Sequence, residues 1–186
     1  FGTWTPKDQT DAEELSAVLA GALGASAPAV QRGGETELYM EVAPGKPAFS
    51  AGLGDALEAD IARSDDGIKI GLLDLLTNNS DRHSGNWMVD SKRKPYAIDH
   101  GMAFLMPNEE GSSAALESPF AANFIDAEGY IEDENPLTPS DIVKVRAALA
   151  GVRDQFERLG RGAWLDSAEG RLDELAAAAT GTRDIY

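Results

Sequence analysis

The chain contains no cysteine in its 186 residues, which excludes a disulfide framework and a thiol nucleophile. It also contains no apolar run of transmembrane length and no lipidation motif. Basic residues are few, because 16 Lys and Arg stand against 32 Asp and Glu, a formal net charge of −16. A charge of this sign and size repels polyanions, so we expect no nucleic-acid partner and no stable membrane association. We expect the protein to be cytoplasmic.

The longest basic cluster is Lys92-Arg93-Lys94, in a polar stretch between two short apolar runs. It is too small for the electrostatic footprint of a nucleic-acid-binding protein. We interpret it as a solvated turn, placed to meet an acidic stretch of a partner better than to anchor a membrane. The 42% hydrophobic fraction on a one-domain length can supply a real core.

Two short acidic motifs lie close together in the middle of the chain. Residues 81–86 (DRHSGN) have the form D-x-x-x-x-N, and residues 99–101 (DHG) have the form D-x-G. In phosphoryl transfer, an Asp accepts the proton of the attacking hydroxyl, while an Asn and a second Asp hold Mg²⁺. Their oxygen donors suit Mg²⁺, which takes only one or two carboxylates from protein. The alternative is that Asp81 caps a turn and Asp99 is a solvated acid at a strand end.

The elements expected around these motifs form a helix, a loop and a hairpin. The apolar run inside residues 67–79 predicts a buried helix that ends at Asn78-Asn79. Residues 87–89 and 96–98 are expected to be short strands, joined by a polar turn over 90–95.

With Asp before His in the first motif, the chain resembles the phosphatidylinositol 3- and 4-kinase-like superfamily, especially its bacterial members. The stretch LLDLLTNNSDRHSGNW together with AIDHG carries the resemblance. The resemblance implies an α+β, two-lobe protein-kinase-like fold with a dominant helical C-lobe and a reduced or truncated N-lobe. It implies ATP and Mg²⁺ as cofactors, and phosphoryl transfer to a hydroxyl of a protein or small soluble molecule.

The same resemblance assigns roles to individual residues. Asp81 would be the general base, His83 a supporting residue of its loop, and Asn86 and Asp99 the Mg²⁺ ligands. His100 stands where many kinases have Phe, and no A-P-E motif follows. A regulated activation segment is therefore not expected.

By the resemblance, residues 1–43 form a partial N-lobe and hinge, and residues 44–186 form the C-lobe. Helical composition predicts a helix over 11–23, and a strand is expected over 37–42. The backbone of Glu41 and Val42 would contact the adenine edge. A plain strand and turn is the other interpretation of these two positions.

Two kinase features are not visible in the sequence: a glycine-rich loop before the first helix, and a lysine on a strand. Lys7 comes shortly before Glu13, the expected ion-pair glutamate, and Gly33-Gly34 fits a hairpin turn. Either further N-lobe strands lie upstream, or the lobe is reduced and activity is compromised. Two alternatives therefore stay open: a pseudokinase-like module that binds a protein partner, and nucleotidyl transfer on the same fold.

The C-terminal part of the chain is expected to be scaffold. Residues 136–140 (PLTPS) signal a helix start with Ser140 as N-cap, and Gly160 ends that helix. A second helix is expected over 167–179. The acidic segment 107–135 is either a substrate-facing loop or a plain excursion of the chain.

Overall fold

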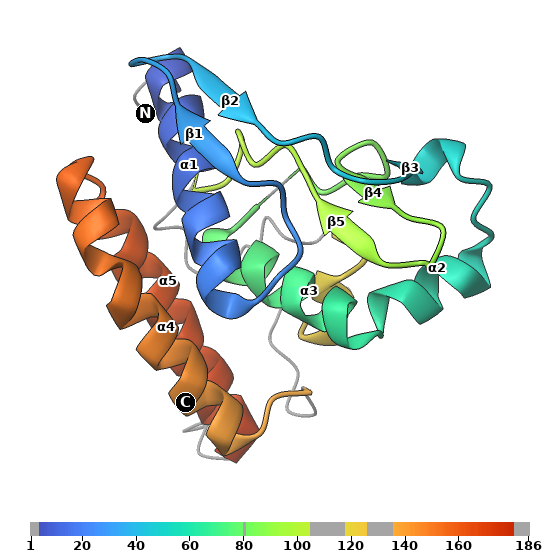
Figure 1. Cartoon of the computed structure of the whole chain (residues 1–186). Helices are drawn as coiled ribbons and strands as arrows, with labels where there is room; N and C mark the ends of the chain where they lie inside the picture. The colour runs from blue at the N-terminus through green and yellow to red at the C-terminus, as the bar shows by residue number, and fades with distance from the viewer. Residues whose placement is uncertain (1–3, 80, 105–117, 126–135, 181–186) are drawn as a thin grey trace.

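The computed structural model describes residues 4–79, 81–104, 118–125 and 136–180. Within these ranges the chain forms five α-helices and two small antiparallel sheets (Figure 1). The mixed α+β class expected from the sequence is therefore confirmed at this level.

Helix α1 (Pro6–Leu23) begins ahead of the predicted start at Asp11. Thr5 and Asp8 form a capping box, in which each side chain accepts from the backbone N–H of the other, and Pro6 occupies the first turn. The helix ends at Gly24, whose φ of 70° is the left-handed cap expected there. Because α1 starts so early, Lys7 lies inside the helix and not on a strand.

The first sheet is a hairpin of β1 (Val30–Arg32) and β2 (Leu38–Met40). The predicted strand over 37–42 is present but shorter, and β1 was not predicted. Gly33 and Gly34 lie in the connecting turn, as expected.

Helix α3 (Asp65–Thr77) leads into the first motif and matches the predicted buried helix. It ends at Asn78, which takes the left-handed conformation with φ 49°. The preceding helix α2 (Asp55–Ala62) was not predicted, because its Asp, Glu and Ala residues give no clear apolar face.

The second sheet has the order β3-β4-β5, with β3 (Lys46–Pro47), β4 (Trp87–Val89) and β5 (Pro95–Ala97). The β4–β5 hairpin is the expected one, but β5 lies one residue ahead of the predicted strand. Short 3₁₀ turns η1 (Ala48–Ser50) and η3 (Ala121–Asn123) complete this part.

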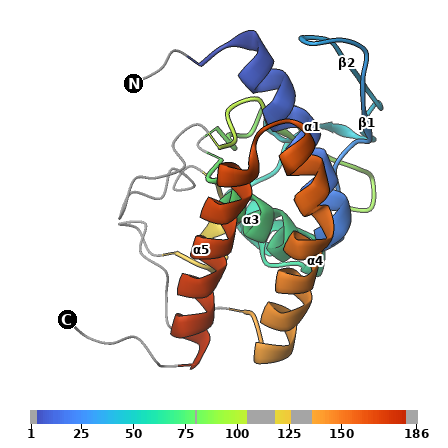
Figure 2. The same cartoon turned by 90° about the vertical axis from the view of Figure 1, so that its left-hand side faces the viewer.

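Helices α4 (Pro139–Arg158) and α5 (Gly162–Thr180) lie side by side (Figure 2). Ser140 is not the N-cap of α4, so that prediction was wrong. Thr138 caps the helix in a second capping box with Asp141, and Pro139 takes the first turn. Gly160 follows the helix with φ 70°, as predicted, and α5 begins ahead of the expected start at residue 167.

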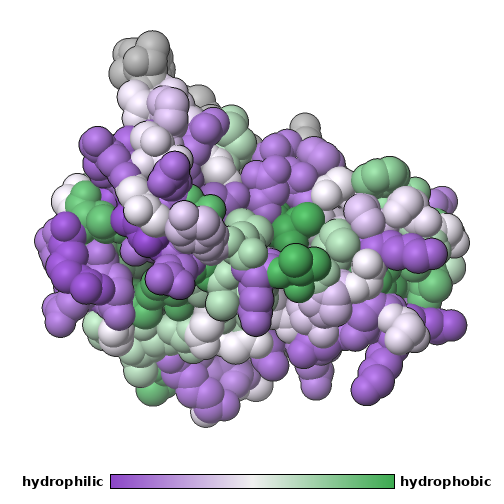
Figure 3. Space-filling view, turned by 45° about the horizontal axis from the view of Figure 1, so that its top comes forward, coloured by the Kyte–Doolittle hydropathy of each residue, from purple (hydrophilic) through white to green (hydrophobic). Residues whose placement is uncertain are grey.

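The main core lies between α1, α3, α4 and α5, and a smaller one lies under the second sheet. Gly71 of α3 allows the close approach of η3, because a Cβ there would lie 2.2 Å from the Phe120 carbonyl oxygen. Hydrophilic side chains cover most of the face seen in Figure 3, with smaller hydrophobic groups between them. Among the described residues, no helix is both long and apolar enough to cross a membrane.

Candidate functional site

Asp81 and Asp99, one from each motif, line the same pocket of about 470 Å³. The pocket lies between the start of α1, the β1–β2 hairpin and the two motif segments. Its lining residues are Pro6, Gln9, Thr10, Glu13, Thr36, Leu38, Asp81, Asp99, Gly101 and Met102. One carboxylate from each motif therefore lines the same pocket.

Asn86 lies behind Asp81 and fixes it. The Asn86 side-chain amide donates to the Asp81 backbone carbonyl at 2.7 Å and to Asp81 Oδ2 at 3.1 Å. From the other side, the Asp81 backbone N–H donates to the Asn79 side chain at 3.1 Å. The Asp81 side chain stays 40% exposed, so a molecule in the pocket can contact it.

A buried ion pair holds the loop of residues 81–86 against α3; this loop is called the catalytic loop below, after the role expected of it from the sequence. Arg82 and Asp74 are both completely buried, and Arg82 Nη2 lies 3.0 Å from Asp74 Oδ1. Asp74 also accepts from Ser118 Oγ at 2.7 Å and from Asn79 Nδ2 at 3.3 Å. A buried charge pair requires such additional hydrogen bonds to offset the loss of water.

The same arginine joins the catalytic loop to residues 99–101, which are called the metal motif below after the role expected of them from the sequence. Arg82 Nη1 donates to the backbone carbonyls of Asn86 and Ile98. Arg82 Nη2 lies 2.9 Å from Nδ1 of His100, which is also buried. Burial, and then the Arg82 charge, hold the pKa of His100 well below its usual value, so the imidazole is neutral.

The sequence analysis did not predict the buried ion pair of Asp74 and Arg82, although the sequence contains an indication of it. Asp74 is the one acidic residue within the apolar run LLDLL, and an acid in such a place requires a buried partner. Arg82, inside the first motif, is that partner.

Glu13 of α1 reaches the metal motif. Burial, and then the neighbouring charge of Asp99, raise the pKa of Glu13 to about 7. Its carboxyl group accepts from the backbone N–H groups of His100 and Gly101, which limits the rise. Glu13 was expected to pair with a lysine, but Lys7 pairs with Asp11 at 2.5 Å instead.

Not all of the predicted residues line the pocket. His83 is exposed, with Nδ1 accepting from the Gly85 N–H at 2.9 Å and Nε2 lying 3.7 Å from Asp81 Oδ1. Glu41 and Val42 follow β2 outside the lining, and the Glu41 N–H already donates to the Ala29 carbonyl at 2.9 Å. Val42 is 93% exposed.

Among the residues that the structure describes, none that lines this pocket is a lysine or arginine. Arg32 of β1 lies near, but it is paired with Asp11 at 2.7 Å and with Glu14. Within the described ranges, no group of three or more His, Cys, Asp and Glu side chains is arranged to hold a metal ion.

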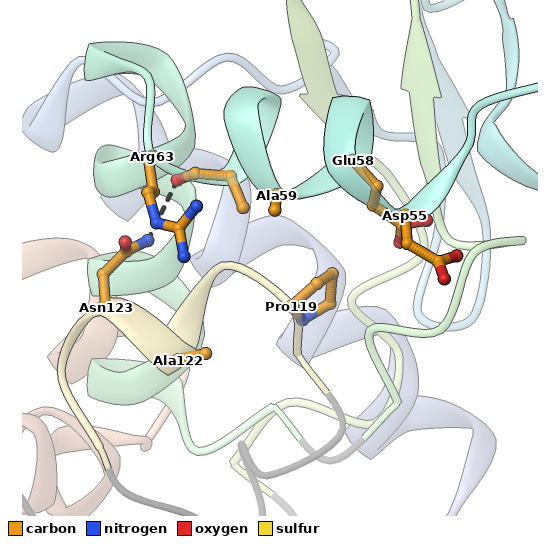
Figure 4. A pocket seen from close by; sticks show the side chains of 8 residues that line it. Asp55, Glu58, Ala59, Arg63, Pro119, Ala122 and Asn123 are labelled. Carbon is orange, nitrogen blue, oxygen red and sulfur yellow. Dashed lines mark hydrogen bonds between the residues drawn. The ribbon is translucent and has the colours of Figure 1, made fainter.

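A second pocket, of about 350 Å³, lies between α2 and η3 (Figure 4). Small residues such as Ala59 and Ala122 form part of its wall, with Arg63 and Asn123 at one end and Asp55 and Glu58 at the other. The Asn123 amide donates to the Ala62 carbonyl at 2.9 Å, which ties η3 to the end of α2. This pocket contains no residue of either motif.

Most of the segment 107–135 lies outside the described residues, so the choice between a substrate-facing loop and an excursion stays a prediction. Comparison of the sequence with protein-family models and with curated proteins gives no match.

Proposed function

We propose that the protein is a Mg²⁺-dependent phosphotransferase that moves the γ-phosphoryl group of ATP to a hydroxyl of a protein or small soluble molecule. In this proposal α1 and the β1–β2 hairpin form a reduced upper lobe over a helical lower lobe, in a kinase-like arrangement. The observation that carries the proposal is the convergence of Asp81 and Asp99 on one pocket, with Asn86 bonded to Asp81.

The chemistry of the donor set fits Mg²⁺. Asp99 lines the pocket, whereas Asn86 lies outside the lining, behind Asp81. Both would supply hard oxygen donors, and Mg²⁺ requires few of these because it keeps several waters and binds the phosphates of its nucleotide. When bound, the ion would neutralise negative charge on the phosphates.

Asp81 has the features of a general base. The Asn86 amide holds one carboxylate oxygen at 3.1 Å, which fixes the direction of the other. The partial exposure of the side chain leaves it accessible to an acceptor hydroxyl. A positioned base of this kind contributes roughly 10²- to 10⁴-fold to a rate.

The electrostatics of the pocket make nucleotide binding dependent on a divalent cation. Asp81, Asp99 and Glu13 are all acids, and none of the described lining residues is basic. A nucleotide without its metal would bring further negative charge into this acidic space, so we expect ATP alone to bind far more weakly than Mg²⁺-ATP.

The lack of a basic residue in the lining also supports a second candidate, a pseudokinase-like module that binds a protein partner and transfers nothing. The loss of a phosphate-positioning cation costs a phosphotransferase a large part of its rate. Nucleotidyl transfer on the same fold stays a further alternative, which mass spectrometry of a modified target separates from phosphorylation.

The test replaces each acid by its uncharged isostere. We expect Asp81→Asn to lower ATP turnover by roughly 10²- to 10⁴-fold, while Mg²⁺-ATP still binds. Asp99→Asn should weaken Mg²⁺-ATP binding itself, as measured by isothermal titration calorimetry. Asp60→Asn, an exposed acid on α2, is the matched control and should leave both measurements unchanged.

The three candidates give different results. Turnover that is unchanged in both variants would rule out the assigned roles. Binding of Mg²⁺-ATP without turnover in the unmodified chain would favour the pseudokinase-like module.

A further inference from the structure

We infer that the α4–α5 helical pair holds the metal motif in place through three aromatic side chains, with Trp4 and Trp164 as positioning residues. The importance of this control for catalysis rests on the proposed function, but the mechanical coupling can be tested without it. The three side chains, Trp4, Phe104 and Trp164, are called the aromatic cluster below.

The backbone of the metal motif is in a conformation that requires support from outside. Asp99 has φ 55° and Phe104 has φ 62°, so residues with side chains occupy the left-handed region on both sides of Gly101. This region is disfavoured for non-glycine residues, and such conformations persist only where surrounding contacts determine them. Contacts that fix Phe104 and the backbone of Gly101 therefore also hold the motif in this conformation.

Phe104 is fixed by contacts with the scaffold. It is completely buried, and its backbone N–H donates to the Thr77 carbonyl at 2.7 Å. Its ring stacks on Trp164 of α5, with the centroids 5.0 Å apart and 11° between the planes. It also meets Phe156 of α4 edge-on at 5.8 Å.

Trp4 connects the same cluster to the motif itself. Its ring stacks on Trp164 with the centroids 5.6 Å apart. Its indole N–H donates to the Gly101 backbone carbonyl at 3.0 Å. One side chain therefore joins the start of α5 to the residue two positions after Asp99.

The turn between α4 and α5 also contacts α1. The Arg161 guanidinium lies 4.5 Å from the centroid of the Trp164 ring. Arg161 also pairs at 2.8 Å with Asp11, whose side chain is completely buried. A displacement of the α4–α5 pair would therefore disturb contacts of both α1 and the metal motif.

Two variants separate positioning from simple stabilisation. Trp4→Phe keeps an aromatic ring and removes the indole donor, and Trp164→Leu removes the stacking partner of Phe104 and Trp4. The matched control is Leu175→Ala, which opens a cavity in the same core at the far end of α5. All three variants are first compared by urea unfolding.

The first readout is hydrogen exchange of the backbone amides of residues 101–104 in the metal-free protein. We expect Trp164→Leu to raise these rates by roughly tenfold and Trp4→Phe by roughly fivefold, relative to a control of equal global stability. If Leu175→Ala raises them as much, the aromatic cluster has no special part and the inference is overturned.

The second readout is binding of Mn²⁺, used as a paramagnetic stand-in for Mg²⁺ and titrated by electron paramagnetic resonance. We expect both tryptophan variants to weaken it by the same factors and Leu175→Ala to leave it unchanged. Equal Mn²⁺ affinity in both tryptophan variants and the original chain would overturn the link to the metal site. If Asp99→Asn binds Mn²⁺ as well as the original chain, the proposed function fails, and the exchange rates alone decide the coupling.

Discussion

The catalytic loop and the β1–β2 hairpin contribute to the same pocket, yet they are held in opposite ways. Behind the loop, Arg82 and Asp74 are completely buried and joined to each other by ion pair and hydrogen bonds. The hairpin consists of two three-residue strands, and Tyr39 of β2 is 68% exposed. Its main polar connection to the rest of the molecule is Arg32, which reaches Asp11 and Glu14 of α1.

The difference shows that one wall of the pocket is held more rigidly than the other. The wall that carries the proposed general base and one proposed metal ligand is fixed by a buried network, whose geometry tolerates little change. The hairpin contributes Thr36 and Leu38 to the opposite wall and buries little apolar surface of its own. Segments of this kind open locally at a lower free energy than buried elements. Substitutions in the catalytic loop should therefore lower the free energy of unfolding more than substitutions in the hairpin, whose main effect should be on local hydrogen exchange.

The largest effect is expected from breaking the buried network. Arg82→Met leaves the Asp74 carboxylate buried without its cation and removes the donor to two backbone carbonyls. We expect the free energy of unfolding, measured in urea, to fall by about 3–5 kcal/mol. Arg146→Met is the control, because Arg146 pairs with Asp173 on the surface and should contribute less than about 1 kcal/mol.

A double variant sharpens this prediction. Asp74→Leu combined with Arg82→Met removes both buried charges, so the loss should be smaller than for Arg82→Met alone. If the double variant is the less stable of the two, the cost comes from lost packing and not from the unpaired carboxylate.

The second prediction concerns Glu13, which lies where the two walls meet. Its pKa is raised from 4.5 to about 7, so the folded protein binds more protons than the unfolded chain between these values. The metal-free protein should therefore lose stability as the pH rises from about 4.5 to above 7, by at most about 3 kcal/mol. Urea unfolding at a series of pH values measures this loss.

Glu13→Gln should flatten that part of the stability profile, because the amide does not titrate. Glu58→Gln on α2 is the control and should keep the slope of the original chain. A slope that survives Glu13→Gln would assign the titration to another group.

The sequence predicted the elements with strong local signals. The apolar run of α3 and its end at Asn78 were read correctly, as was the β4–β5 hairpin within one residue. The start of α1 was missed because Thr5 and Asp8 form a capping box ahead of the apolar pattern. A capping box also explains the error at α4, where Thr138 and not Ser140 is the N-cap. Pro139 was assigned to a turn, but it occupies the first turn of the helix.

In the candidate site, too, local motifs were predicted, whereas features that depend on tertiary packing were not. Motif spacing indicated that Asp81, Asn86 and Asp99 belong together. Asp81 and Asp99 line one pocket, whereas Asn86 lies outside the lining and contacts Asp81. The aromatic cluster could not be predicted from the sequence, because Trp4 and Trp164 lie far apart in the chain and only tertiary packing brings them together. The high pKa of Glu13 likewise depends on burial by distant segments.

The smallest effect is expected at the hairpin, where Arg32→Met breaks its connection to α1. Asp11 keeps Lys7 and Arg161 as partners, so its buried carboxylate is not left unpaired. We therefore expect a loss of only about 1 kcal/mol in the free energy of unfolding, well below that of Arg82→Met. Hydrogen exchange should nevertheless rise in residues 30–40, because the hairpin has lost its main polar contact with α1. A loss as large as that of Arg82→Met would mean that the two walls are equally integrated into the fold, which would remove the contrast between them.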